Sequence, residues 1–130
     1  PTQLAAYGFL PASAYLDKVV MHKTLRHVLD NWDWAETWGW DFPMLAMCAA
    51  RLGKPEIAVA YLLDYPAFDF DACGLVGGGR APFPYFPGNG GLLYAVAMMA
   101  AGWDGAPSGN APGFPKKGWT VKHEGLYKAL

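Results

Sequence analysis

The feature that most constrains the fold is a break of only three residues, Gly53-Lys54-Pro55, between two apolar helical patterns. The first pattern, over 44–52, opens after Pro43 and stops at Gly53, a residue type that commonly ends helices. The second, over 56–63, follows directly on Pro55, and proline is well suited to the first turn of a helix. So short a connection makes the second helix run back along the first, which predicts a tight antiparallel hairpin.

One further helix is expected on each side of this hairpin. Ser13 is placed to cap a helix that runs to about residue 30, with Asp17 in its first turn. Apolar residues lie on two faces of that helix, which indicates that other helices cover it on both sides. The last helix is expected over 91–101, begun by Asn89 or by the glycine after it.

Two segments lie between or after these helices. Residues 65–91 are rich in proline, glycine and aromatic residues, and a loop of that length is usually functional or mobile. Residues 119–126 alternate loosely between apolar and polar, which predicts a short C-terminal strand. The expected fold class is therefore all-α, with helical hairpins and long aromatic loops.

The composition bears on the partners of the chain. Charged residues make up only 16% of the 130 residues and 53% are hydrophobic, whereas globular domains average about 25% charged. An isolated chain covers so much apolar surface poorly, so we expect it to belong to something larger or to an obligate oligomer. A net charge of −1 without a basic stripe argues against nucleic acid as a partner. The longest mainly apolar run, 90–103, is shorter than the ~20 residues that span a bilayer, so no membrane span is expected.

Metal and cofactor sites are not expected either. Cys48 and Cys73 lack the spacing of a metal motif, and His22 and His27 are five residues apart, which does not place them on one helical face. The glycine-rich segment 77–80 could cradle an anion, but it lacks the Lys-Ser/Thr pair of a phosphate loop. No metal, nucleotide or other cofactor is therefore predicted.

The segment that carries most chemical information is 32–41, with the sequence Trp-Asp-Trp-Ala-Glu-Thr-Trp-Gly-Trp-Asp. It holds four of the six tryptophans and three carboxylates at a junction between two helices. Indole is costly to expose and finds a partner for its N–H when buried. Flat aromatic faces beside carboxylates suit the C–H faces and hydroxyls of a sugar, so the segment predicts one wall of a sugar-binding pocket. The alternative is a tryptophan-filled core in which the acids act as helix caps.

Three parts of the sequence together resemble the six-hairpin glycosidases: Trp38-Gly39-Trp40-Asp41, the helical stretch 46–63, and Pro82-Phe83-Pro84-Tyr85-Phe86-Pro87-Gly88-Asn89-Gly90-Gly91. The likeness is to the C-terminal part of the catalytic barrel in the inverting α-L-fucosidase group and its bacterial relatives. It implies that residues 1–112 are part of an (α/α)6 toroid. Residues 113–130 are similar to the exit of that barrel toward a β-domain. The resemblance also implies an extracytoplasmic protein.

The chain departs from the fucosidases at the catalytic base. The aspartate that serves as base in that group aligns with Pro87, which can neither accept a proton nor orient water. The general acid of the family lies upstream of the matching region. Fucosidase activity is therefore not carried over, and the isolated chain is expected to be inactive.

Within the chain, Asp41 and Glu36 are the candidate catalytic carboxylates. An inverting glycosidase needs an acid and a base about 6.5–9.5 Å apart, which leaves room for a water molecule between them. The alternative for Asp41 is to cap the helix that Pro43 begins, and the alternative for Glu36 is an ordinary surface or capping position.

Four more side chains, Trp38, Trp40, Tyr85 and Asn89, are candidate substrate contacts. The indoles would stack on sugar rings, or else pack in the core. Asn89 would bind a pair of sugar hydroxyls or cap the next helix, and Tyr85 would line the pocket or fill the loop. The function expected is that of a glycoside hydrolase whose partners are a carbohydrate and either the remaining part of the barrel or a second copy of the chain. The alternative is a non-catalytic carbohydrate-binding or structural helical module.

Overall fold

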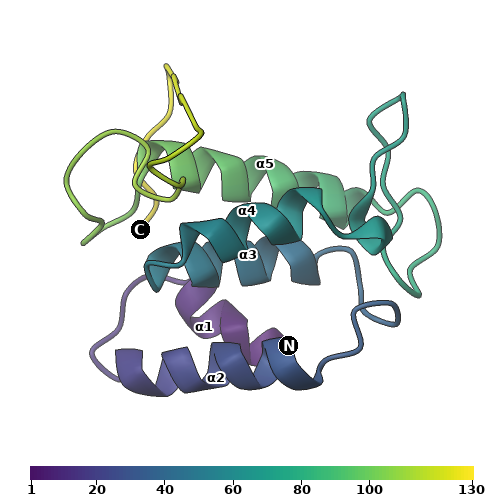
Figure 1. The fold of residues 1–130 in the computed structure, drawn as a ribbon, viewed down its shortest axis with the longest axis horizontal. Helices are drawn as coiled ribbons and strands as arrows, with labels where there is room; N and C mark the ends of the chain where they lie inside the picture. The colour runs from purple at the N-terminus through teal and green to yellow at the C-terminus, as the bar shows by residue number, and fades with distance from the viewer.

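A computed structural model describes all 130 residues and contains five α-helices, two short 3-10 helices and no sheet (Figure 1). The elements are η1 (Thr2–Leu4), α1 (Ala5–Gly8), α2 (Lys18–Asn31), α3 (Asp41–Arg51), α4 (Pro55–Leu63), η2 (Pro66–Phe68) and α5 (Phe86–Ala101). The all-α prediction is confirmed. None of these helices combines the length and the apolar character needed to cross a membrane.

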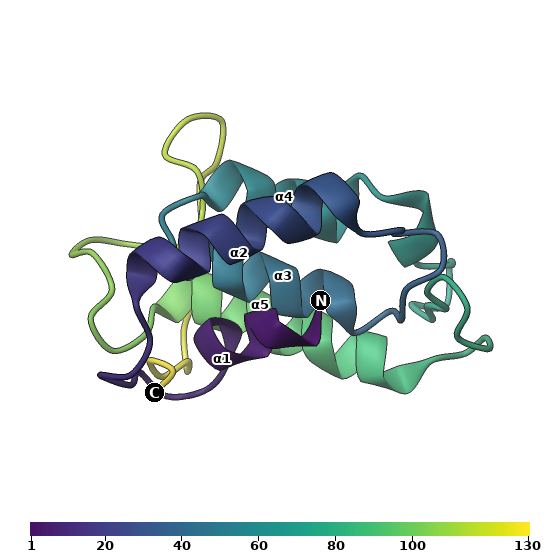
Figure 2. The same ribbon diagram turned by 90° about the horizontal axis from the view of Figure 1, so that it is seen from below.

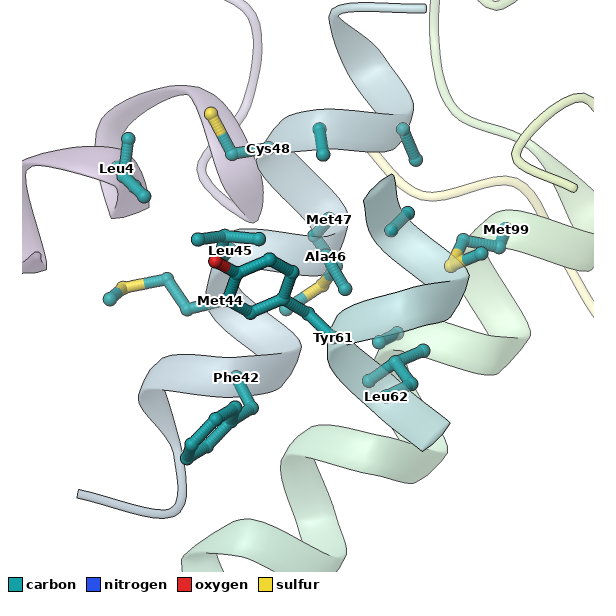
Figure 3. Close-up of a cluster of buried hydrophobic side chains, with 14 of the residues drawn as sticks. Leu4, Phe42, Met44, Leu45, Ala46, Met47, Cys48, Tyr61, Leu62 and Met99 are labelled. Carbon is teal, nitrogen blue, oxygen red and sulfur yellow. The ribbon is translucent and has the colours of Figure 1, made fainter. Parts of the chain in front are cut away.

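Helix α3 is the centre of the molecule, and every one of its residues is buried. Helices α1 and α2 lie on one side of it, and α4 and α5 cover it from the other (Figures 1 and 2). Its large side chains, among them Phe42 and Leu45, form the core with Tyr61 and Leu62 of α4 and with Met99 of α5 (Figure 3). A helix that is apolar all round is stable only when neighbours surround it, and α3 meets that condition here.

The predicted hairpin is present as α3 and α4. Gly53 takes the left-handed conformation, with φ of 74°, which glycine adopts without steric cost. The Lys54 N–H donates to the Ala49 carbonyl at 2.9 Å, so it satisfies one of the free carbonyls at the end of α3. Pro55 is the first residue of α4, as expected.

Helix α2 begins later than predicted, because Asp17 and not Ser13 is its cap. The Asp17 carboxylate accepts hydrogen bonds from the N–H groups of Val19 and Val20, at 2.6 and 3.2 Å. One carboxylate oxygen thus serves two free donors of the first turn, and its charge also suits the positive end of the helix dipole. The Ser13 hydroxyl accepts from the Tyr15 N–H at 3.2 Å and belongs to the turn before the helix.

Helix α5 begins at Phe86, five residues before the predicted start, and takes in the glycine-rich run that reads as loop. Pro87 fits the first turn because the N–H that it lacks has no partner there. Asn89 does not cap this helix, since its side-chain N–H donates to the Gly74 carbonyl at 2.6 Å. The expected role of Asn89 as a cap is therefore wrong.

The predicted C-terminal strand over 119–126 is absent. The strand-like pairing in the last part of the chain is an isolated bridge, in which Ala129 donates to the Gly102 carbonyl at 2.9 Å and accepts from the Asp104 N–H at 3.0 Å. No neighbouring strand offers a ladder to 119–126, and the glycines at 118 and 125 both take positive φ. The loose alternation of apolar and polar residues predicted a strand, but no neighbouring strand is available to pair with it.

The helices leave two sets of loops at opposite ends of the molecule. The segment before α3 and the segment before α5 meet at one end, and the C-terminal segment lies at the other, beside the end of α5 (Figure 1). An isolated bridge between Trp38 and Gly79, with a hydrogen bond from the Arg80 N–H to the Thr37 carbonyl, holds the first two segments together. The candidate site lies at this first end.

Candidate functional site

Residues 32–40, here called the tryptophan loop, divide their four indoles between core and surface. Trp34 is buried and packs edge-on against Tyr61, with ring centroids 4.8 Å apart, and against Phe42 at 5.4 Å. The other three, Trp32, Trp38 and Trp40, are between 42% and 49% exposed. The core interpretation thus fits one indole, while the other three are partly exposed at the same end of the molecule.

Asp41 anchors the tryptophan loop. The carboxylate is only 2% exposed, and its Oδ2 accepts from the Thr37 hydroxyl and, at 3.1 Å, from the Trp38 N–H. The Thr37 hydroxyl in turn accepts from the indole N–H of Trp32 at 3.2 Å. Asp41 is the first residue of α3, and its carboxylate bonds back to the loop instead of capping the helix. Its negative charge still lies in the first turn, where the helix dipole favours it.

The second oxygen of this carboxylate, Oδ1 of Asp41, is buried and has no hydrogen-bond partner. A buried charged acceptor without a donor is costly, and such groups are normally satisfied by protein, water or ligand. Asp41 is one of the residues around a cavity of about 280 Å³. The unpaired oxygen itself is enclosed by the surrounding protein and has almost no accessible surface.

The glycine-rich segment 77–80 packs directly against the backbone of the tryptophan loop. A Cβ at Gly79 would lie 2.0 Å from the Thr37 carbonyl oxygen, and one at Gly78 would lie 2.2 Å from the Gly39 Cα. Only glycine allows two backbones to approach so closely. Since the Arg80 N–H donates to the Thr37 carbonyl at 3.2 Å, this contact also fixes Arg80 beside the cavity.

The cavity brings together most of the predicted site. Its lining includes Glu36, Asp41, Trp38 and Trp40, which are both candidate carboxylates and both candidate indoles. The remaining lining residues are Pro1, Thr2, Trp32, Thr37 and Arg80. Glu36 is exposed at this cavity, whereas Asp41 is enclosed. The arrangement combines three aromatic faces with two carboxylates and one guanidinium.

Two predicted contact residues do not line this cavity. Tyr85 packs behind Trp38, with ring centroids 5.7 Å apart, and so supports the pocket wall. Burial, together with the nearby negative charge of Asp41, raises the pKa of the Tyr85 phenol. Asn89 lies in the first turns of α5, where it holds the loop at Gly74.

Sequence reasoning missed Trp32, Thr37 and Arg80. Trp32 and Thr37 belong to the same dense cluster as the predicted residues, so the cluster itself was the available signal. Arg80 reaches the site only through the contact between two loops about forty residues apart in sequence, which no local pattern reveals.

No group of three or more His, Cys, Asp or Glu side chains is arranged to hold a metal ion. Comparison of the chain with protein-family models, with curated proteins and with solved structures finds no match. The chemistry of the cavity is thus the basis for a functional proposal.

Proposed function

We propose that this chain is part of an (α/α)6 toroid in a glycoside hydrolase, and that the cavity at the tryptophan loop binds the sugar. The observation that carries the proposal is the set of three half-exposed indoles around a cavity with carboxylates and a guanidinium. The sequence likeness to six-hairpin glycosidases points the same way.

A sugar matches both kinds of group in the cavity. The C–H face of a pyranose is apolar and packs on the flat faces of Trp38 and Trp40, while its rim of hydroxyls needs hydrogen-bond partners. At the cavity, Glu36 is an acceptor and Arg80 is a donor. Ligand sites generally combine apolar walls with a few polar groups that fix orientation.

The two carboxylates have different roles in this proposal. Glu36 is exposed and can activate or position a water molecule, as the base of an inverting glycosidase must. Asp41 is buried and accepts hydrogen bonds from Thr37 and Trp38, so it fixes the loop that carries the indoles. The general acid would come from another part of the barrel, in line with the family resemblance.

The toroid part of the proposal is supported by apolar side chains on the outside of the helices. On α5, Leu93 is 73% exposed, and Phe86 and Val96 are also exposed. Val19 and Val20 are exposed on α2. Exposed apolar patches of this kind commonly mark interaction surfaces, and in a toroid the neighbouring hairpins would cover them.

The sugar site is tested with alanine variants of Trp38 and Trp40, assayed for oligosaccharide binding by calorimetry. Each should weaken binding about two- to tenfold, because an aromatic stacking contact contributes about 0.5–1.5 kcal/mol. Trp119→Ala is the matched control, since this indole is 42% exposed but packs on Phe114 at the opposite end of the molecule. Unchanged binding in both cavity variants would refute the stacking role.

The burial of Asp41 favours one alternative, a carbohydrate-binding module without catalysis. Glu36→Gln, made in the complete protein, separates a hydrolase from a binding module. In a hydrolase, it should abolish turnover and leave binding nearly unchanged. A wild-type protein that binds oligosaccharide without releasing reducing ends would establish the binding module instead.

A further inference from the structure

A second cavity, of about 290 Å³, lies between α1, the start of α3 and the first half of α5. Its walls expose only apolar atoms. The aromatic residues that line it, Phe9, Trp40 and Tyr94, are all partly exposed. The remaining lining residues are Thr2, Ala5, Pro43, Met44, Met47, Pro87, Gly90 and Gly91.

This apolar cavity borders the sugar cavity. Trp40 and Thr2 are among the lining residues of both, so Trp40 separates a cavity with polar groups from one with apolar walls. Each cavity is close to the lower end of the range of about 300–1,000 Å³ that is usual for ligand pockets. A ligand larger than one cavity would therefore reach past Trp40 into the other.

The walls restrict what such a ligand can place in the apolar cavity. A second sugar ring there would find no hydrogen-bond partner on the walls, so the hydroxyls that face the walls would lose water without compensation. An aromatic ring or alkyl chain loses nothing of that kind, and it packs against Tyr94 and Phe9.

We infer that the ligand is a glycoside with an apolar aglycone, whose sugar lies at the tryptophan loop and whose aglycone lies in the apolar cavity. This inference rests on the proposed sugar site. A ligand of this class differs from a polysaccharide, in which a further sugar and not an apolar group follows the glycosidic bond.

Gly90 offers a way to close the apolar cavity without disturbing the fold. It lies inside α5, and a Cβ built on it meets no atom within 4 Å. Because Gly90 lines the cavity, Gly90→Leu adds a branched side chain at its wall, and Gly90→Ala is a control that adds one methyl group. Its neighbour Gly91 is not suitable, because a Cβ there would lie 2.5 Å from Pro43 Cγ.

The experiment compares 4-nitrophenyl and methyl glycosides of glucose, galactose, xylose and L-fucose, with binding to the full chain measured by calorimetry. For a sugar that binds, the nitrophenyl glycoside should bind about tenfold more tightly than the methyl glycoside, from the apolar area that its ring buries. Gly90→Leu and Tyr94→Ala should remove most of this difference while leaving methyl glycoside affinity unchanged. Gly90→Ala should keep most of it.

Equal affinity for the two ligands, or equal weakening of both by Gly90→Leu, would overturn the inference and leave the sugar site standing. Self-association that Gly90→Leu abolishes would also overturn it, because a second copy would then occupy the cavity. Failure of every glycoside to bind would count against the proposed function and would overturn the inference with it.

Discussion

Thr37 is the residue on which the tryptophan loop most depends, and replacing it by valine gives a sharp test of the site. Its hydroxyl is buried, donates to the Asp41 carboxylate and accepts from the Trp32 indole. Valine has nearly the same shape but no hydroxyl. Thr37→Val therefore leaves Asp41 with the Trp38 N–H as its sole donor.

The size of the effect follows from these contacts. A hydrogen bond to a charged group contributes about 1.5–3 kcal/mol, and the oxygen that loses the Thr37 hydroxyl keeps the Trp38 N–H. Trp32 is 42% exposed, so its N–H can turn to water and adds little. We expect Thr37→Val to lower the free energy of unfolding by about 2–3 kcal/mol.

Urea titration followed by circular dichroism measures this loss. Thr37→Ser keeps the hydroxyl and should retain most of the stability. Thr24→Val is the matched control, because the Thr24 hydroxyl is exposed and donates to the Val20 carbonyl at 3.0 Å within α2; it should change stability by less than about 0.5 kcal/mol. If Thr37→Val behaves like Thr24→Val, or if Thr37→Ser is equally destabilising, the Asp41 anchor is refuted.

Three further predictions concern the core and the loop contact. Gly79 and Gly74 both take positive φ, but only a Cβ at Gly79 meets backbone atoms. In urea titrations, Gly79→Ala should therefore lower the free energy of unfolding by about 1–3 kcal/mol more than Gly74→Ala does. Equal losses would contradict the close contact. Trp34→Ala should lower the free energy of unfolding by about 3–5 kcal/mol by calorimetry, and a loss below about 1 kcal/mol would mean that this indole is not core. Burial raises the pKa of the Cys48 thiol to about 12, so a disulfide reagent at neutral pH should modify only Cys73 until the chain is denatured. Between about pH 9 and 12 the unfolded chain loses the Cys48 thiol proton while the native chain keeps it. The free energy of unfolding should therefore fall by up to about 1.4 kcal/mol per pH unit in this range. Cys48→Ala should reduce that slope.

The helices that the sequence predicted best are those with local signals. Gly53 and Pro55 specify the end of α3 and the start of α4 through their own backbone preferences, so no knowledge of the tertiary structure was needed. The start of α5 was missed because its glycines read as loop. A Cβ at Gly91 would clash with Pro43, and one at Gly88 would lie 2.9 Å from Val76, so these glycines let α5 pack closely and tertiary contact outweighs helix propensity.

The sequence pattern predicted where the site residues cluster, but it did not predict how their side chains are arranged in space. Four indoles within nine residues indicated a special segment, yet the loop has no regular period that would tell which indole is buried. Trp34 is the buried one because it meets Tyr61 and Phe42, and both contacts are tertiary. Arg80 joins the site through the glycine contact with the Thr37 carbonyl, which likewise depends on the fold.

The Asp41 carboxylate fixes the loop that carries the indoles, and its two oxygens differ. Oδ2 of Asp41 accepts from Thr37 and Trp38, while Oδ1 is buried without a donor. In Asp41→Asn, the amide oxygen can keep the first set of bonds and the amide nitrogen then replaces Oδ1 as a donor. The substitution therefore removes the charge while preserving the hydrogen bonds of the anchor. A folded Asp41→Asn chain should bind sugar as the wild type does, and a loss of binding would show that the carboxylate charge itself acts at the cavity.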